Sequence, residues 1–165
     1  MKNIVPLIMA GIFLFQFTSC NEVAKVERKL SGTTWDIVLV EGEGFYTGEC
    51  GTPASTYDEW STSNAGTYEF TDASGFFGVD SDAKGGTLTL DYEYTLNSRT
   101  ITVSKTLNFD WYFLDDFLVI HNPDEFYFRD YAIDDFDKKS WVLAHSEGDG
   151  LGCSGYTTYH HIERQ

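Results

Sequence analysis

Two segments of alternating apolar residues, joined at Asn97-Ser98, occupy residues 87–107 of this sequence, TLTLDYEYTLNSRTITVSKTL. If Asn97 and Ser98 form a two-residue turn, the numbers of opposed residues add up to 195, and the apolar side chains of both segments share one face. The opposed apolar pairs are then Tyr94 with Ile101, Tyr92 with Val103 and Leu88 with Leu107. Lys105 and Arg99 are the exceptions on this face. Because a slip of one residue would expose every apolar group, the pattern predicts an antiparallel hairpin with one face over a core.

The sequence beyond this hairpin also consists of short alternating segments separated by turn residues. Further strands are expected at about residues 34–40, 67–71, 75–80, 113–121 (interrupted at Asp115-Asp116), 125–131, 141–145 and 156–162. Residues 41–65 are rich in Gly, Ser and Thr and are expected to form a long loop. No long stretch has helical apolar spacing. Eight to ten short strands in sequential hairpins predict an all-β, antiparallel up-and-down barrel of about eight strands, whose closure removes exposed sheet edges.

The first 19 residues carry one early lysine, Lys2, and an apolar run, IVPLIMAGIFLF, that ends before Cys20. This run is shorter than the ~20 apolar residues of a membrane-spanning helix, so we interpret it as a secretory signal peptide. Residues 17–20, Phe-Thr-Ser-Cys, resemble the lipobox of bacterial lipoproteins, with Phe17 in place of the usual Leu. The resemblance implies cleavage before Cys20 and its acylation by chains such as palmitate. The alternative is an ordinary signal peptide followed by a chance cysteine.

This lipoprotein resemblance divides the chain into a signal peptide at residues 1–19, a lipidated tether at 20–30 and a barrel domain at 31–165. The tether is polar with alternating charges, and it is expected to be extended or to form a short entry helix. Each buried methylene of an acyl chain contributes about 0.8 kcal/mol to membrane attachment, so no spanning helix is needed. The expected location is the cell envelope. Asn21 is not the Asp that retains some lipoproteins at the inner membrane, which favours the outer membrane or the cell surface.

Acidic residues dominate the charge of the chain. The sequence has 11 Lys and Arg against 26 Asp and Glu, and loss of Lys2 with the signal peptide leaves 10 against 26, a net charge of −16. Nucleic acid is therefore excluded as a partner, because phosphate binding requires a cationic face. A cationic protein, a cation or a neutral ligand is compatible with this charge. The alternative is that the charge only keeps the protein soluble.

Cys50 and Cys153 are the two cysteines that remain if Cys20 carries lipid. In an oxidising compartment they are expected to form one disulfide. Closing a loop of about 100 residues contributes about 4.7 kcal/mol in the chain-entropy model. The alternative is a reactive thiol at Cys153. Leu151 stands where a nucleophile elbow requires Gly, and no helical pattern follows, which disfavours catalysis by Cys153.

Residues 30–35, Leu-Ser-Gly-Thr-Thr-Trp, resemble the Leu-x-Gly-x-Trp opening of lipocalins and of the lipocalin-like domains of small bacterial lipoproteins. Here one additional residue separates Gly32 from Trp35. The resemblance implies that Trp35 packs across the first strand at the bottom of the barrel and that a large loop follows this strand. It also implies that a ligand binds in the open end of the barrel.

The interior of such a barrel either holds one small ligand or is filled by its own side chains. The 13 Phe, 10 Tyr and 4 Trp residues are compatible with both arrangements. If a pocket exists, the expected ligand-binding residues are Trp35, Phe70, Tyr92, Tyr94, Ile101, Val103 and Phe128. The tyrosine hydroxyls would then orient the bound molecule.

Two acidic groups offer weaker indications of a cation site. Asp80, Asp82 and Gly85 imitate part of a calcium loop, but Lys84 occupies a ligand position, and a hairpin turn is the alternative. The second group is either a cation site or a solvated rim, and consists of Asp130, Asp134, Asp135 and Asp137. Neither spacing leads us to assign a metal site.

Catalytic signatures are absent from the sequence. His160 and His161 would point to opposite faces of one strand, so they cannot chelate one metal from it. No Ser, His and Asp grouping has a recognisable local signature. A hydrolase would require two carboxylates converging in a cleft with perturbed pKa values. We therefore assign no catalytic residue, no metal and no cofactor.

These observations predict a non-enzymatic, lipid-anchored, lipocalin-like protein that binds a small apolar or amphipathic ligand, or a surface partner. The alternative is an acidic inhibitor that captures a cationic secreted protein. The two functions differ in where binding occurs. The first needs an internal cavity, whereas the second needs an anionic patch with salt-sensitive association.

Overall fold

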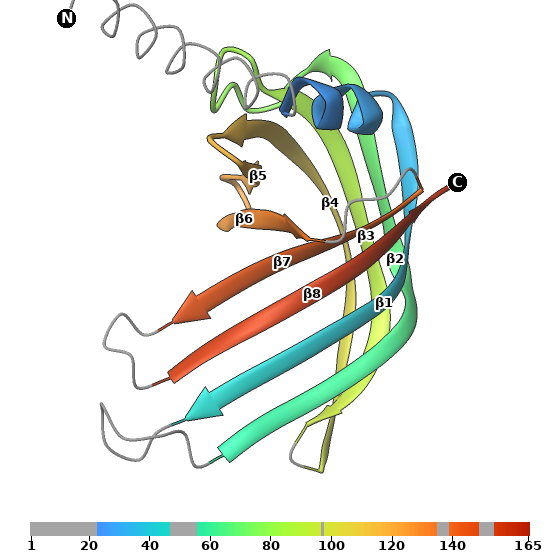
Figure 1. Ribbon diagram of the computed structural model, residues 1–165, viewed down its shortest axis with the longest axis vertical. Coiled ribbons are helices and arrows are strands. Elements are labelled where there is room, and N and C mark those ends of the chain that lie inside the picture. The colour runs from blue at the N-terminus through green and yellow to red at the C-terminus, as the bar shows by residue number, and fades with distance from the viewer. Residues whose placement is uncertain (1–22, 47–55, 97, 135–138, 149–153) are drawn as a thin grey trace, which may run out of the picture.

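A closed barrel of eight antiparallel strands makes up most of the described residues in this computed structural model (Figure 1). The structure describes residues 23–46, 56–96, 98–134, 139–148 and 154–165. The strands are β1 (Thr33–Tyr46), β2 (Thr56–Ser74), β3 (Lys84–Leu96), β4 (Arg99–Leu114), β5 (Phe117–Asn122), β6 (Tyr127–Asp134), β7 (Ser140–Gly148) and β8 (Ser154–Arg164). Each strand pairs with its neighbours in sequence, and β1 closes the barrel on β8. The predicted antiparallel up-and-down barrel is confirmed.

The hairpin of β3 and β4 has the register that the sequence predicts. Tyr94 pairs with Ile101, and Tyr92 pairs with Val103. The same register continues along the whole hairpin as far as Lys84, which pairs with Trp111. Inward side chains of β3 become more buried away from the turn, and Leu88 is fully buried. The hairpin is therefore one wall of the barrel, with its apolar face inside.

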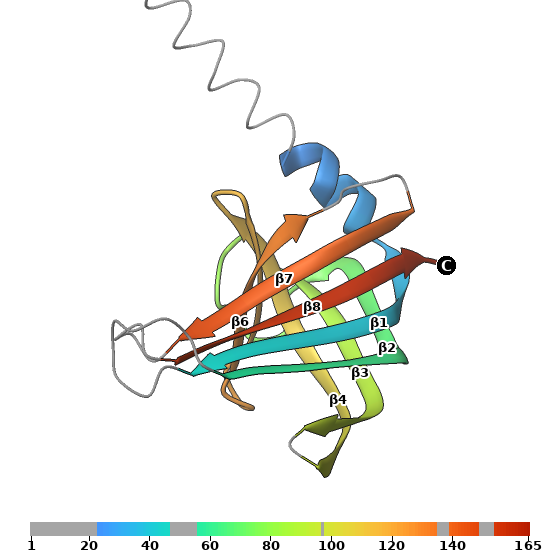
Figure 2. The same cartoon turned by 60° about the horizontal axis from the view of Figure 1, so that its bottom comes forward.

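A short helix over residues 23–30 packs against the end of the barrel where β1 begins, which we call the closed end (Figures 1 and 2). Leu30 is fully buried, and Val26 packs against the same core. Lys84 of β3 holds the helix, because its Nζ lies 2.8 Å from both Glu27 Oε1 and Ser31 Oγ. The expected entry helix is confirmed. Within the described residues, no helix has the length and apolar character needed to cross a bilayer.

Large aromatic side chains fill the closed end. The rings of Trp35 and Trp141 lie 4.6 Å apart, and Phe70 packs edge-on against Phe109 and Trp111. All five side chains are buried. Burying an aromatic side chain of this size stabilises the fold by about 2–3 kcal/mol. This half of the interior is therefore a packed aromatic core.

The prediction of a long loop over residues 41–65 was wrong. β1 extends to Tyr46 and β2 begins at Thr56, and the two strands pair along this part. The glycines of β1 that suggested a loop instead make room for rings inside the barrel. A Cβ at Gly42 would overlap the side chains of Trp60 and Tyr156, and a Cβ at Gly44 would lie 3.0 Å from the Tyr156 ring.

The strand predicted at residues 75–80 was also wrong. This segment is a loop whose backbone surrounds the buried carboxylate of Asp110. Asp110 accepts hydrogen bonds from the amides of Phe76, of Phe77 at 3.1 Å and of Val79 at 3.4 Å. A chain that wraps a carboxylate in this way cannot form a ladder with a neighbouring strand. The calcium-like spacing that follows forms a turn, in which the Asp82 amide donates to Asp80 Oδ1 at 2.9 Å.

Phe128 was expected to line a pocket, but it does not lie on the inward face of β6. Phe126 belongs to the preceding turn, with a left-handed φ of 51°, and is 96% exposed. Phe128 is 47% exposed and its ring contacts His121 edge-on, so its predicted place in the interior was wrong. Tyr127, Arg129 and Tyr131 occupy the inward positions instead.

Candidate binding site

The interior changes character between the closed end and the opposite end, which we call the mouth. At the mouth, Trp60 of β2 stacks on Tyr94 of β3 with ring centroids 3.7 Å apart, and Tyr92 lies 6.0 Å from the same indole. The indole Nε1 of Trp60 donates a hydrogen bond to the Tyr156 hydroxyl from β8. The three tyrosines are only partly buried. The mouth is therefore lined by rings that combine apolar faces with polar edges.

A pocket of about 180 Å³ lies beside this cluster. Its walls come from β6, β7 and β8, with Leu90 from β3 and Tyr156 linking it to the aromatic cluster. The polar side chains that matter most for its chemistry are Tyr127, Arg129, Tyr131, His145, Glu147 and His160. This is enough space for several water molecules or for part of one small ligand.

A chain of buried hydroxyls runs along the inner side of this pocket. The hydroxyls of Tyr127 and Tyr131 lie 3.0 Å apart, and the Tyr131 hydroxyl lies 3.3 Å from that of Tyr68. Tyr68 is in turn hydrogen-bonded to Nδ1 of His160 at 2.7 Å. Burial raises the pKa of all three tyrosines well above 10. These hydroxyls are therefore neutral donors and acceptors at physiological pH.

His160 is neutral for a related reason. Burial lowers its pKa to about 4, and electrostatic interactions with His145 and Arg129 act in the same direction. An unprotonated imidazole can accept a hydrogen bond from a tyrosine hydroxyl. His161, the next residue, points outward and lies 2.8 Å from Glu41 Oε2, so the prediction of opposite faces is confirmed.

Two cationic side chains lie close to one ring at this pocket. The guanidinium carbon of Arg129 is 4.9 Å from the ring centroid of Tyr127, and the Lys105 ammonium is 5.8 Å from it. Arg129 Nη1 lies 2.9 Å from Glu147 Oε1, and Lys105 Nζ lies 3.2 Å from Glu125 Oε2. Positive charge therefore gathers on the inner face of a chain whose overall formal charge is −15.

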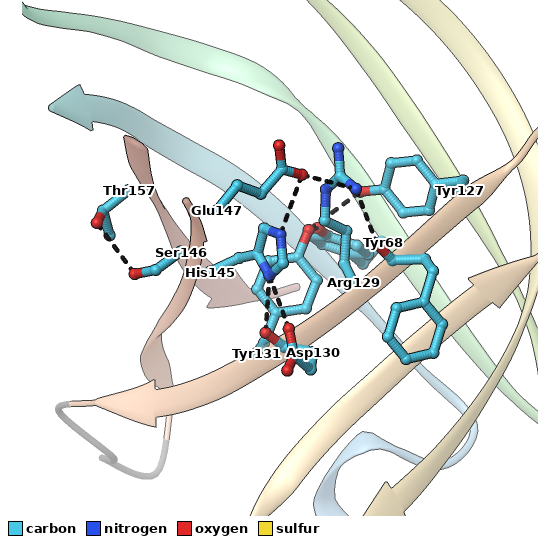
Figure 3. Close-up of polar contacts among 10 residues, drawn as sticks. Tyr68, Tyr127, Arg129, Asp130, Tyr131, His145, Ser146, Glu147 and Thr157 are labelled. Atoms are coloured by element: carbon cyan, nitrogen blue, oxygen red, sulfur yellow. Dashed lines mark hydrogen bonds and ion pairs between the residues drawn. The ribbon is translucent and has the colours of Figure 1, made fainter. Parts of the chain in front are cut away.

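The pocket lies at a seam between β6 and β7. In the described residues, these strands share a ladder of three pairs, from Ala132↔Ala144 to Asp134↔Val142. On the mouth side of Ala132, side chains connect the two strands instead (Figure 3). His145 Nδ1 lies 2.9 Å from the Asp130 carbonyl oxygen, and Glu147 reaches Arg129. The wall of the barrel is here made of side chains rather than of backbone hydrogen bonds.

The residues predicted to bind a ligand are divided between the two ends. Trp35 and Phe70 belong to the packed closed end, and none of the seven predicted residues lines the pocket itself. Tyr92, Tyr94 and Val103 pack at the mouth against the core, and Ile101 is half-buried opposite Tyr94. The structure therefore brings together the predicted residues of the β3–β4 hairpin.

Most residues of the pocket itself escaped the sequence analysis. Arg129 was missed because Phe128 was expected to face the interior. Neighbouring residues of a strand point to opposite faces, so this placed Arg129 on the outside. Lys105 gave a signal, since it broke the apolar alternation of its strand. Trp60 was placed in a loop, although it lies in β2.

The other predicted sites receive no test here. Cys20, Cys50 and Cys153 lie outside the described residues, as do Asp135 and Asp137. Across the described ranges, no group of three His, Cys, Asp or Glu side chains is arranged to hold a metal ion. Asp130 is instead engaged by His145, with Nδ1 3.0 Å from its Oδ1.

Comparison with known proteins adds no assignment. No protein-family model, curated protein or solved structure matches this chain. A function must therefore be inferred from the barrel itself. Its mouth has neutral hydroxyls and a guanidinium around one cavity and stacked rings beside that cavity, which are groups suited to binding an amphipathic molecule.

Proposed function

We propose that this protein is a non-enzymatic, lipocalin-like binding protein of the cell envelope that takes a small apolar or amphipathic molecule into the mouth of its barrel. The observation that supports this most directly is the difference between the two ends. Trp35 and Trp141 pack against each other at the closed end, whereas the other end keeps a cavity of about 180 Å³ beside the rings of Trp60, Tyr92 and Tyr94.

Burial of apolar area at the mouth would provide the affinity. Covering partly exposed rings gains about 25 cal/mol for each Å² of apolar surface removed from water. The faces of Tyr92 and Tyr94 are such surfaces, because both side chains are only partly buried. Hydroxyl and indole edges would then orient the molecule, as polar groups do in most ligand pockets.

The proposed lipid anchor fits this geometry. Acyl chains on Cys20 would attach the protein to a membrane of the cell envelope, most simply the outer one. Residues 23–30, the described helix, follow Cys20 closely and pack against the closed end. The anchor and the mouth would therefore lie at opposite ends, and the mouth would face away from the membrane that holds the protein.

Native mass spectrometry of the protein isolated from its own host tests the proposal. A bound mass of lipid-like size, lost on mild activation, is the expected result. The rival function, capture of a cationic protein by exposed carboxylates, predicts an empty barrel and a basic partner that is released by salt. That outcome would replace our proposal.

A matched pair of variants places the binding inside the barrel. Tyr94→Ala removes an inward ring of β3, whereas Glu93→Ala changes its outward neighbour. We expect Tyr94→Ala to weaken binding of decan-1-ol about tenfold and Glu93→Ala to leave it unchanged. Equal effects of the two variants would exclude an interior site.

A further inference from the structure

We infer that the molecule bound in this barrel carries an anionic head group, a carboxylate on an apolar tail, and that Arg129 binds this head group at the seam between β6 and β7. The inference rests on the proposed function, because it names the chemical class of the ligand for the same cavity. It follows from four features of the seam.

The first feature is the position of Arg129. Its side chain belongs to the pocket wall and is only 32% exposed, although the chain as a whole is strongly acidic. Its Nη1 donates to the Phe128 carbonyl oxygen at 2.8 Å, which holds the guanidinium in place. That bond and the contact with Glu147 both use Nη1. A guanidinium has five N–H donors in a planar fork that matches a carboxylate, so Arg129 can bind more than these two acceptors.

The second feature is the carboxylate already at this place. Glu147 Oε1 lies 2.9 Å from Arg129 Nη1 and 3.2 Å from His145 Nε2, and the Glu147 side chain is 54% exposed (Figure 3). An ion pair this exposed contributes only about 0–1 kcal/mol. Glu147 therefore shows that the site accepts a carboxylate, and it is held weakly enough to be displaced by a ligand whose tail is buried at the same time.

The third feature is a second positive charge nearby. Lys105 and Arg129 both lie close to the Tyr127 ring, 5.8 Å and 4.9 Å from its centroid. Lys105 pairs with Glu125, which is 56% exposed, so this pair is also weak. Both cations point to the inside of the barrel, where they favour an anion over a cation.

The fourth feature is the continuity between head-group site and tail site. Tyr156 lines the pocket and also binds the Trp60 indole of the aromatic cluster. A tail that leaves Arg129 would meet Leu90 and the Tyr156 ring, which line the same cavity, and the Trp60 indole lies next to Tyr156. The neutral hydroxyls of Tyr127 and Tyr131 can donate to the head group without repelling it, because burial keeps their pKa values well above 10.

Three ligands with the same tail test the inference: decanoate, decan-1-ol and decyltrimethylammonium. Their affinities are measured by calorimetry on the complete mature chain in which only Cys20→Ser is changed, so that no attached acyl chain competes. We expect decanoate to bind at least tenfold more tightly than decan-1-ol, and decyltrimethylammonium to bind most weakly. The preference for the carboxylate should decrease as salt increases.

Variants identify the residue responsible. Arg129→Gln should lower the affinity for decanoate at least tenfold and leave the affinity for decan-1-ol unchanged. Glu147→Gln should strengthen decanoate binding several-fold, because the competing carboxylate is gone. Arg164→Gln, at the exposed end of β8, removes the same charge elsewhere and should have no effect.

The outcomes separate this inference from the proposed function. If decan-1-ol and decanoate bind equally well, or the ammonium compound binds best, the head-group site is wrong while interior binding stands. An unchanged decanoate affinity in Arg129→Gln also overturns it, and retained decan-1-ol binding shows that this variant is folded. If none of the three ligands binds, both the inference and the proposed function fail.

Discussion

The hydroxyl of Tyr68 lies 2.7 Å from Nδ1 of His160, in a part of the interior where both side chains are buried. Tyr68 comes from β2 and His160 from β8, on opposite sides of β1 in the barrel. Their hydrogen bond therefore connects two walls through the interior. Burial keeps the His160 imidazole unprotonated in the folded state, and this makes the stability of the barrel sensitive to acid.

The free energy of unfolding should fall as the pH decreases from about 6.5 to 4. The unfolded chain binds a proton at His160 near pH 6.5, whereas the folded chain, with a pKa of about 4, does not. The folded state is therefore favoured above this window and loses about 3 kcal/mol of stability across it from His160 alone.

Urea unfolding of the wild type and of His160→Gln at several pH values isolates this contribution. Other groups titrate in both proteins, so the difference between the two curves is the quantity of interest. We expect the variant to have the smaller loss of stability in acid. Parallel curves would show that His160 is not the group responsible.

Asp110→Ala should destabilise the barrel by at least 3 kcal/mol. The change leaves the partly buried amides of Phe77 and Val79 without their acceptor, and each hydrogen bond to a charged group contributes about 1.5–3 kcal/mol. Asp110→Asn keeps one acceptor oxygen and should lose less. Asp116→Ala, in an exposed turn, serves as the control in the same denaturant titrations. Equal midpoints for Asp110→Ala and Asp116→Ala would contradict the structural role of Asp110.

Gly66→Ala should cost more stability than Gly78→Ala. Both glycines have positive φ, 142° and 65° respectively, so both substitutions strain the backbone. A Cβ at Gly66 would also overlap the Thr89 carbonyl of β3, whereas a Cβ at Gly78 meets nothing within 4 Å. We expect about 1 kcal/mol for Gly78→Ala from backbone strain alone and several kcal/mol for Gly66→Ala. Thermal unfolding of the two variants measures the difference, and a similar loss for both would mean that β2 and β3 separate easily at this point.

Leu30→Ala should lower the free energy of unfolding by about 2–5 kcal/mol, the usual cost of a cavity left by a buried leucine. Leu30 is fully buried, although it ends a helix of only two turns outside the barrel. Lys25→Ala changes an exposed position of the same helix and should have little effect. If both variants resemble the wild type, the helix does not contribute to closing the barrel.

The alternation of apolar and polar residues predicts the strands of this barrel better than the turns and loops between them. The β3–β4 register follows from side chains within one hairpin, since every pair is fixed once the turn is placed. The inward face of β6 depends on the turn before it. In this turn Phe126 has a left-handed backbone conformation, which a phenylalanine in the sequence does not predict. The loop around Asp110 depends on a contact between residues more than 30 positions apart, which alternation within a strand cannot reveal.

The binding site was predicted in part for the same reason. Tyr92 and Tyr94 were found because they belong to the regular hairpin. Trp60 was missed because Gly42 and Gly44, which make room for the mouth rings, look like loop residues in the sequence. Glycine in a strand can mark the place where a ring from elsewhere in the chain approaches the backbone.

The three-pair ladder between β6 and β7 has a consequence for how the barrel fluctuates. Among the described residues this is the shortest ladder of the barrel, so amide protons near Tyr131 and His145 should exchange with solvent through small motions, long before the other strands separate. A molecule can then enter through the side of the barrel while the packed tryptophans at the closed end stay in place. A molecule bound across β6 and β7 would hold the two strands together and slow the exchange of these amide protons.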